Sequence, residues 1–269
     1  MAMSRSRNEM LTSPHNPLLK EIRKAVQRGS LTASGHAVAE NFHLLSEALQ
    51  SGLKVERVVA ASSVAPRVEA VLPNNVPLVL VDDSTFKTVA TTETSQGVLA
   101  LVEPPQWTLG QVFGEESVTS LVVVLDRIQE PGNAGAIVRA AEAFGATGVL
   151  SVTGTANAYN PKFLRASAGS VFRLPLIASL GYSELIQLLD QHRTRIFTLD
   201  AHGTTPVHDA DLTTSSAIII GNEGGGVAEE LLERSERLRI PVQLVESLNA
   251  AVAAGVALYE ARRQRESRR

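Results

Sequence analysis

The chain has 269 residues, no cysteine and a formal net charge of −3, which excludes disulfides, thiolate metal sites and thiol nucleophiles. Hydrophobic residues make up 44% and aromatic residues 4%, so this is a globular composition whose core must be aliphatic. The start of the chain lacks the apolar segment of a signal peptide, and no run is long enough to span a bilayer. We therefore expect a cytoplasmic protein.

Both ends of the chain are basic. The first thirty residues contain six Lys or Arg against two Glu, and the last eight contain five Arg. Such ends either contact phosphate or are solvated termini. Taken alone, the pattern favours solvated termini.

The first hundred residues alternate between expected helices and strands. A Ser-Pro-His-Asn turn opens a helix over 17–27, and a second helix is predicted over 38–50. Apolar runs predict strands at 55–60, 78–81 and 97–102, with a short helix over 82–89. The result is a small α/β domain without an obvious cluster of chemically active residues.

The strongest break in the chain is the pair Pro104 and Pro105, because two adjacent prolines continue neither a helix nor a central strand. The stretch that follows is poor in periodic pattern. We place a first domain at 1–104, a linker at 105–117 and a second domain at 118–269.

The second domain alternates in the same way. Strands are expected at 121–125, 148–152, 195–199, 217–220 and 239–242, with helices over 133–144, 184–191, 228–236 and 247–264. This alternation predicts an α/β fold with a mostly parallel sheet and helices on both faces. Ligands of such sheets bind beyond the carboxyl ends of the strands, and three of these ends are unusual here.

The first unusual strand end leads through a Pro-Gly turn into the helix over 133–144. Asn133 could cap that helix, and Gly132 and Gly135 permit close backbone approach. A capped junction leaves Arg139 unexplained, because an arginine among small apolar residues usually needs an anionic partner.

The second and third strand ends carry polar groups among small residues. At 221–226, four glycines surround Glu223 directly after a buried strand, which indicates close approach of a ligand rather than a free loop. At 240–249, Ser247 or Asn249 could cap a terminal helix rich in Ala and Gly, a face suited to core packing or to a dimer interface. Neither a phosphate-binding loop nor a dinucleotide fingerprint is present, and the six histidines form no metal pattern.

In this order and near these spacings, the three segments resemble the signature motifs of the SpoU (TrmH-like) family of RNA methyltransferases. The first motif is Asn133 to Arg139, the second is 221–226, and the third is 240–249. Residues 165–170 are similar to a further family segment. More loosely, 13–20, Glu40 and 96–97 resemble the ribosomal-protein-like substrate-binding domain of some members.

The resemblance implies a trefoil knot at the C-terminal end of the catalytic domain, an exception to the usual absence of threading. It also implies a homodimer, S-adenosylmethionine as the cofactor and no metal. The residues that the resemblance assigns to the cofactor are Leu199, Gly221, Asn222, Ile240, Val242 and Leu248.

The activity implied is methylation of a ribose 2′-hydroxyl in RNA, ribosomal RNA more than transfer RNA. Arg139 would orient an RNA phosphate and activate the hydroxyl, and because arginine is a poor base it needs help from Glu223 or the phosphate. Asn133, Ser247 and Asn249 would orient Arg139 and the ribose. The alternatives are a transfer RNA ribose methyltransferase, an enzyme that methylates a base nitrogen, and a catalytically silent RNA-binding protein of the same fold.

Overall fold

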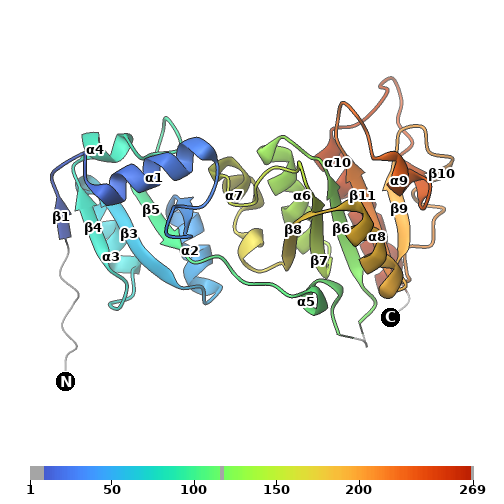
Figure 1. Cartoon of the computed structure of the whole chain (residues 1–269), viewed down its shortest axis with the longest axis horizontal. Helices are drawn as coiled ribbons and strands as arrows, with labels where there is room; N and C mark the ends of the chain where they lie inside the picture. The colour runs from blue at the N-terminus through green and yellow to red at the C-terminus, as the bar shows by residue number, and fades with distance from the viewer. Residues whose placement is uncertain (1–8, 116–117, 268–269) are drawn as a thin grey trace. The chain divides into compact units, whose positions relative to one another are not determined.

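The computed structural model describes residues 9–115 and 118–267, which divide into two compact units (Figure 1). The first unit holds the chain up to Pro105 together with Tyr159–Phe172. The second holds Gln106–Ala158 and the chain from Arg173 onward. Over the described residues, every helix is too short or too polar to cross a membrane.

The first unit is built on a mixed sheet of five strands in the order β1-β4-β3-β5-β2. The strands β1, β4 and β3 run parallel, whereas β5 runs antiparallel to β3 and β2. Leu19 and Ile22 of the first helix are fully buried in the core of this unit, which also contains Val59 and Leu99 of the sheet. The elements of this unit are β1 (Glu9–Leu11), α1 (Pro17–Arg28), β2 (Ala37–Glu40), α2 (Phe42–Gln50), β3 (Val55–Ala61), a 3-10 turn (Ser62–Val64), α3 (Ala65–Val71), β4 (Leu78–Val81), α4 (Asp83–Lys87), β5 (Val98–Val102), α7 (Pro161–Ser167) and a second 3-10 turn (Ser170–Phe172).

The helix expected over 38–50 is wrong in its first part, because Ala37–Glu40 form the strand β2. All four residues of β2 are buried, and the strand pairs with β5. The helix α2 begins only after Asn41, whose side chain accepts a hydrogen bond from the Leu44 N–H at 2.8 Å. The apolar run 37–39 fits either element, and the pairing with a distant strand decides between them.

The segment Tyr159–Phe172, which sequence analysis counted with the second domain, makes its contacts in the first unit. Phe163 and Leu164 of α7 are buried, and α7 lies against β2. The Arg165 guanidinium also donates a hydrogen bond to the Thr91 hydroxyl. Burial of these apolar side chains explains why the segment joins this unit.

The second unit is built on seven strands in the order β10-β12-β9-β11-β6-β7-β8, and every pair of neighbours is parallel. The expected α/β fold with a mostly parallel sheet is confirmed. The elements of this unit are α5 (Leu109–Phe113), β6 (Leu121–Asp126), α6 (Pro131–Ala143), β7 (Gly148–Val152), β8 (Leu176–Leu180), α8 (Tyr182–Gln191), β9 (Arg195–Leu199), β10 (Thr205–Pro206), β11 (Ser216–Gly221), α9 (Glu229–Leu232), β12 (Glu236–Arg239) and α10 (Ala250–Glu266).

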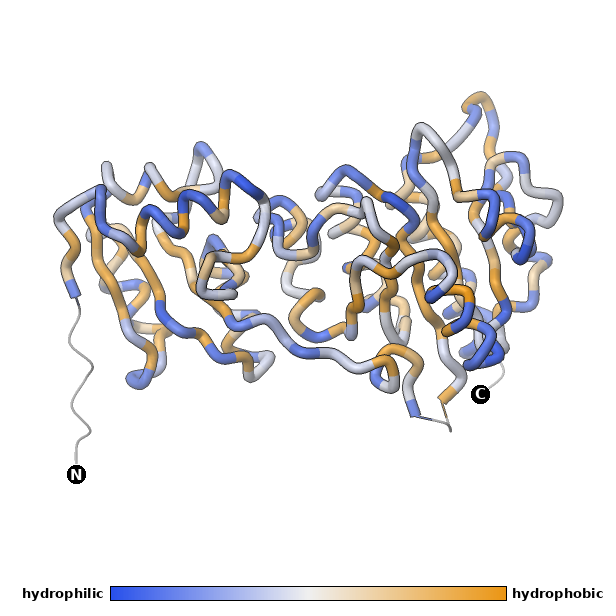
Figure 2. Tube along the Cα trace, viewed as in Figure 1, coloured by the Kyte–Doolittle hydropathy of each residue, from blue (hydrophilic) through white to orange (hydrophobic). Residues whose placement is uncertain are grey.

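Apolar side chains cover the two faces of the seven-stranded sheet. Val122 and Val124 of β6 belong to a core shared with α5, α8 and α9, while α6 and α10 pack against each other (Figure 1). Successive residues of a strand point to opposite faces, so a strand between two helical layers must be apolar throughout. The continuous hydrophobic colour of the central strands in Figure 2 reflects this arrangement.

Parts of the second unit differ from the expected elements. The short helix α5 lies within the expected linker, opened by a capping box of Thr108 and Gln111. The helix expected over 228–236 is wrong beyond Leu232, because Glu236–Arg239 instead form β12 beside β9. The strand expected at 239–242 therefore lies three residues earlier in the chain. Only Leu238 of β12 is buried, so the polar residues before it gave no sign of where the strand begins.

Candidate active site

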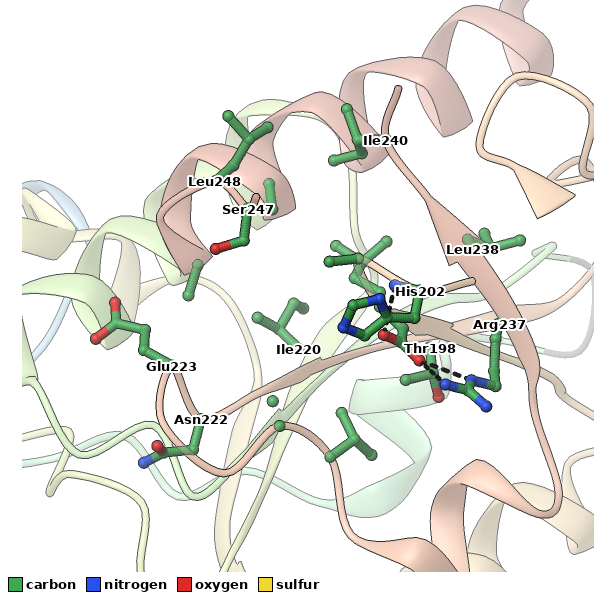
Figure 3. A pocket seen from close by; sticks show the side chains of 18 of the residues that line it. Thr198, His202, Ile220, Asn222, Glu223, Arg237, Leu238, Ile240, Ser247 and Leu248 are labelled. Carbon is green, nitrogen blue, oxygen red and sulfur yellow. Dashed lines mark hydrogen bonds and ion pairs between the residues drawn. The ribbon is translucent and has the colours of Figure 1, made fainter. Parts of the chain in front are cut away.

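A cavity of about 450 Å³ lies at the carboxyl ends of β9 and β11 and is closed by the segment that follows β12 (Figure 3). Its walls combine apolar side chains, such as Ile220 and Leu238, with polar groups from the loops. The volume falls within the ordinary range of about 300–1,000 Å³ for small-molecule sites. All six residues that sequence analysis assigned to a cofactor line this cavity, namely Leu199, Gly221, Asn222, Ile240, Val242 and Leu248.

The end of β11 and the glycine loop approach each other very closely at Gly221. A Cβ added to Gly221 would lie 2.5 Å from the carbonyl carbon of Gly226. Two backbone hydrogen bonds between Asn222 and Gly226, of 3.1 and 2.8 Å, close the loop into a tight turn. Gly221 is therefore needed for this turn, which forms one wall of the cavity.

Sequence reasoning missed Asp200 and Arg237, which line the other end of the cavity. The two side chains form an ion pair, and the Asp200 carboxylate also accepts a hydrogen bond from the His202 N–H at 2.9 Å. Burial acts to raise the pKa of Asp200, but the His202 N–H and the Arg237 guanidinium outweigh it and hold that pKa below its ordinary value. Asp200 directly follows β9, so the rule that ligands bind at strand ends could have found it.

Three of the five expected catalytic residues meet at the edge of the cavity. The Asn133 amide donates to Oε1 of Glu223, and the Asn249 amide donates to the same oxygen at 3.2 Å and to the Asn133 amide oxygen at 3.2 Å. Each residue comes from a different motif, and their sequence positions span more than a hundred residues. The fold thus brings all three motifs to one point.

Asn133 is available for this cluster because it does not cap α6. That helix begins at Pro131, and the Glu130 carboxylate accepts from the Gly132 N–H at 3.2 Å. The expected cap at Asn133 is therefore wrong, since proline at the first helical position starts α6 two residues earlier. At the third motif, Asn249 is the cap of α10 and accepts from the Ala251 N–H at 3.0 Å.

The other two expected catalytic residues lie apart from the hydrogen-bonded cluster. Ser247 lines the cavity, and Figure 3 shows it on the same side as Glu223, away from His202 and Arg237. Arg139 is exposed on α6 and makes no hydrogen bond or ion pair with any described residue. A free, exposed guanidinium close in sequence to Asn133 suits contact with an external anion.

The charges around the cavity restrict the ligands that fit it. The lining contains the carboxylates of Asp200, Glu223 and Glu246 against the single guanidinium of Arg237. This surplus of negative charge disfavours phosphates and favours a ligand with net positive charge. Within 9–115 and 118–267, no group of three or more His, Asp or Glu side chains is placed to hold a metal.

Comparison with known proteins finds the family that the three sequence motifs resemble, and it finds a substrate-binding domain within the first unit. Residues 120–259 match the model of the SpoU rRNA Methylase family, and residues 16–100 match that of an MRM3-like substrate binding domain.

Two curated relatives and one solved structure extend this similarity. A Bacillus subtilis 23S rRNA (guanosine(2553)-2′-O)-methyltransferase is 29% identical over 94% of this chain and 99% of its own length. A Streptomyces viridochromogenes 23S rRNA (uridine(2479)-2′-O)-methyltransferase is 36% identical over 64% of this chain and 62% of its own. The structure of the SpoU methyltransferase AviRb from Streptomyces viridochromogenes, in complex with AdoMet, is 27% identical with a TM-score of 0.82 and covers 94% of this chain and 99% of that one.

Proposed function

Because the chain belongs to the SpoU rRNA methylase family, we propose that it transfers a methyl group from S-adenosylmethionine to a ribose 2′-hydroxyl of ribosomal RNA. The observation that carries the proposal is the Asn133–Glu223–Asn249 cluster at the edge of a nucleoside-sized cavity. The two curated relatives act on guanosine and on uridine. The ribose, which is common to both, is therefore the group that the site is built to methylate.

The cavity fits S-adenosylmethionine in charge and in shape. At neutral pH the cofactor carries one carboxylate, one ammonium and one sulfonium, so its net positive charge matches the acidic lining. Ile240, Leu248 and Leu199 offer apolar surface to an adenine ring, and the backbone at Gly221 and Asn222 offers hydrogen bonds. When bound, the cofactor supplies a methyl group already activated by the sulfonium charge.

The chain's own residues must then position the ribose and accept its proton. Glu223 receives both amide donors on Oε1, and its Oε2 makes no hydrogen bond to any described residue. That oxygen is placed to accept the proton of the 2′-hydroxyl, while Asn133 and Asn249 hold the carboxylate in orientation. Ser247 would hydrogen-bond the ribose, and Arg139 would bind the adjacent phosphate because guanidinium groups match phosphate geometry.

We also propose that the C-terminal segment is knotted. After β12, the chain returns to α10, which packs on α6, and on the way it lines the cavity beside the loops that follow β9 and β11. A chain that passes between loops in this manner is consistent with the trefoil knot that the family resemblance implies.

A homodimer through the catalytic domain is the proposed assembly. Val252, Val256 and Tyr259 are 53%, 38% and 57% exposed and recur along one face of α10. An apolar stripe of this kind on a surface helix indicates a partner helix. Light scattering of Val256→Arg should show a monomer where the unaltered protein is a dimer; a dimer in both would contradict this interface.

The first unit is proposed to bind the RNA. The main part of this unit keeps the expected bounds near 1–104, and a linker near 105–117 follows it. Lys20, Lys24 and Arg28 are exposed along one face of α1, and none pairs with a described carboxylate. Like charges spaced by four residues destabilise a helix by a few tenths of a kcal/mol each. A polyanion such as RNA would relieve that repulsion.

Two measurements test the proposed function. Calorimetry should show S-adenosylmethionine binding, and mapping of 2′-O-methyl groups should find one ribosomal RNA site that is lost without the protein. Glu223→Gln keeps the size of the side chain and should retain cofactor binding while methyl transfer falls about 100-fold or more. Absence of cofactor binding at millimolar concentration would instead identify a silent RNA-binding protein, and a site found only in transfer RNA would correct the substrate.

A further inference from the structure

The carboxylate of Asp126 is fully buried at the end of β6, outside the residues assigned so far to the cofactor or to the ribose. Its Oδ1 accepts from the Tyr182 hydroxyl at 2.8 Å and from Arg127 Nε at 3.0 Å. Its Oδ2 accepts from the Ala228 N–H at 2.8 Å and from Arg127 Nη2 at 3.3 Å. A buried carboxylate that accepts four hydrogen bonds is a strongly oriented group, because its two oxygens are fixed by a guanidinium, a backbone N–H and a phenol.

Two of these contacts lead to the ends of the glycine loop. Ala228 is the residue at which the loop ends, and Asp126 holds it directly through its N–H. At the other end, the carbonyl of Arg127 accepts from the Asn222 amide at 2.8 Å. Glu223 lies between these two anchors, so residues 126 and 127 fix the piece of chain that carries the proposed proton acceptor.

The backbone of Arg127 is held in an uncommon conformation for this purpose. Its φ is +54°, in the left-handed region that a non-glycine residue rarely adopts. The Thr155 hydroxyl accepts from the Arg127 N–H at 3.1 Å and itself donates to the Leu125 carbonyl at 3.1 Å. The ion pair to Asp126 and the bond to Thr155 together support a turn that aims the Arg127 carbonyl at Asn222.

We propose that Asp126 is a positioning residue for methyl transfer, which holds the glycine loop at Ala228 and, through Arg127, at Asn222. This inference rests on the proposed function of the Glu223 site. Asp126 does not itself touch the cavity; it acts through the loop that forms the cavity wall.

The test compares Asp126→Asn with Tyr182→Phe. The asparagine has nearly the same shape but presents an NH₂ group to one of the donors, whereas Tyr182→Phe removes one hydrogen bond that does not lead to the loop. In the free protein, amide hydrogen exchange over 222–228 should accelerate in Asp126→Asn and stay unchanged in Tyr182→Phe. The Kd for S-adenosylmethionine should rise about tenfold or more in Asp126→Asn only, because only that variant weakens the charge-assisted hydrogen bond that holds the loop at Ala228.

Thr155→Val keeps the proposal testable if Asp126→Asn does not fold. It removes the acceptor for the Arg127 N–H without touching the buried carboxylate, so exchange over 222–228 should again accelerate, with a smaller rise in Kd. Unchanged loop exchange and Kd in these variants, in a protein that otherwise binds the cofactor and methylates RNA, would overturn the positioning role. If the unaltered protein neither binds the cofactor nor methylates RNA, the proposed function fails instead.

Discussion

The two units use their sheets in different ways. In the second unit all strands run parallel, so the carboxyl ends of β6, β9 and β11 share one edge and bring Asn133, Asp200 and Glu223 to a single cavity or its rim. In the first unit β5 runs against its neighbours, and the buried carboxylate of Glu40 accepts from the Thr91 N–H at 2.6 Å, a purely internal contact. The parallel sheet of the second unit therefore brings polar residues from several strand ends to one edge. The mixed sheet of the first unit instead supports the charged face of α1.

The largest expected effect tests whether the second unit supplies the residues that promote methyl transfer. Arg139→Ala should lower the rate of methyl transfer by about 100-fold or more, because the charge proposed to hold the adjacent phosphate and to stabilise the reacting hydroxyl is removed. The Kd for S-adenosylmethionine should stay the same, since Arg139 does not line the cavity. Single-turnover kinetics and calorimetry measure the two quantities.

Arg234→Ala is the matched control for that experiment, because Arg234 is an exposed arginine of the same unit, paired with Asp190. It should leave the rate unchanged. Equal rates of methyl transfer in Arg139→Ala and Arg234→Ala would show that Arg139 has no part in the reaction.

The next effect tests how tightly the cavity wall is built. In Gly221→Ala the new Cβ would lie 2.5 Å from Gly226, so the loop must shift. We expect a loss of about 1–3 kcal/mol in the free energy of unfolding and weaker cofactor binding. Gly225→Ala, whose Cβ meets nothing within 4 Å, should unfold as the unaltered protein does in a urea titration. Equal free energies of unfolding for the two variants would show that the turn accommodates a Cβ at Gly221.

A smaller effect tests whether the first unit contributes affinity for RNA rather than catalytic residues. Changing Lys20, Lys24 and Arg28 to Gln together should make the slope of log K for RNA against log salt shallower by about 2 to 3, as three phosphate contacts are lost. The rate at saturating RNA should not change. The control substitutes Lys54, Arg57 and Lys87, which lie elsewhere in the first unit, and a slope that falls equally in both would mean that only overall charge matters.

The smallest effect concerns the partner of Asp126 in the second unit. Burial and the hydrogen bond to Asp126 raise the pKa of Tyr182 to about 12 from an ordinary 10.0. A raised pKa favours the neutral phenol in the fold, so this contribution is complete below pH 10 and is lost as the pH rises toward about 12. Urea midpoints of the unaltered protein should therefore fall more steeply than those of Tyr182→Phe in this window; parallel curves would contradict the coupling.

The sequence predicted the parallel sheet and the location of the site because both depend on local patterns. A buried parallel strand is a continuous apolar run, and the glycines of 221–226 mark a close approach wherever they lie. The hydrogen-bonded partners of Asn133 were not predictable in the same way. Its capping role was the local interpretation, and only the fold shows that Glu130 performs that role.

The elements that sequence analysis missed or misplaced depend on distant partners. The strand β2 is defined by its pairing with β5, and β12 by its pairing with β9, neither of which leaves a clear period in the sequence. Asp126 and Asp200 were overlooked because neither belongs to one of the three motifs and neither has a neighbour in the sequence that points to a role. Their importance lies in the donors that converge on them from other elements.

The attachment of Tyr159–Phe172 to the first unit has a consequence for synthesis of the protein. The chain is made from its N-terminus at ~5–20 residues per second. After Pro105 has been made, the first unit therefore remains without α7 for several seconds. During that time β2 lacks its contact with α7, and β6, α6 and β7 of the other unit have already been made. Neither unit can therefore finish folding before synthesis of the other has begun, and we expect the two to mature together rather than one after the other.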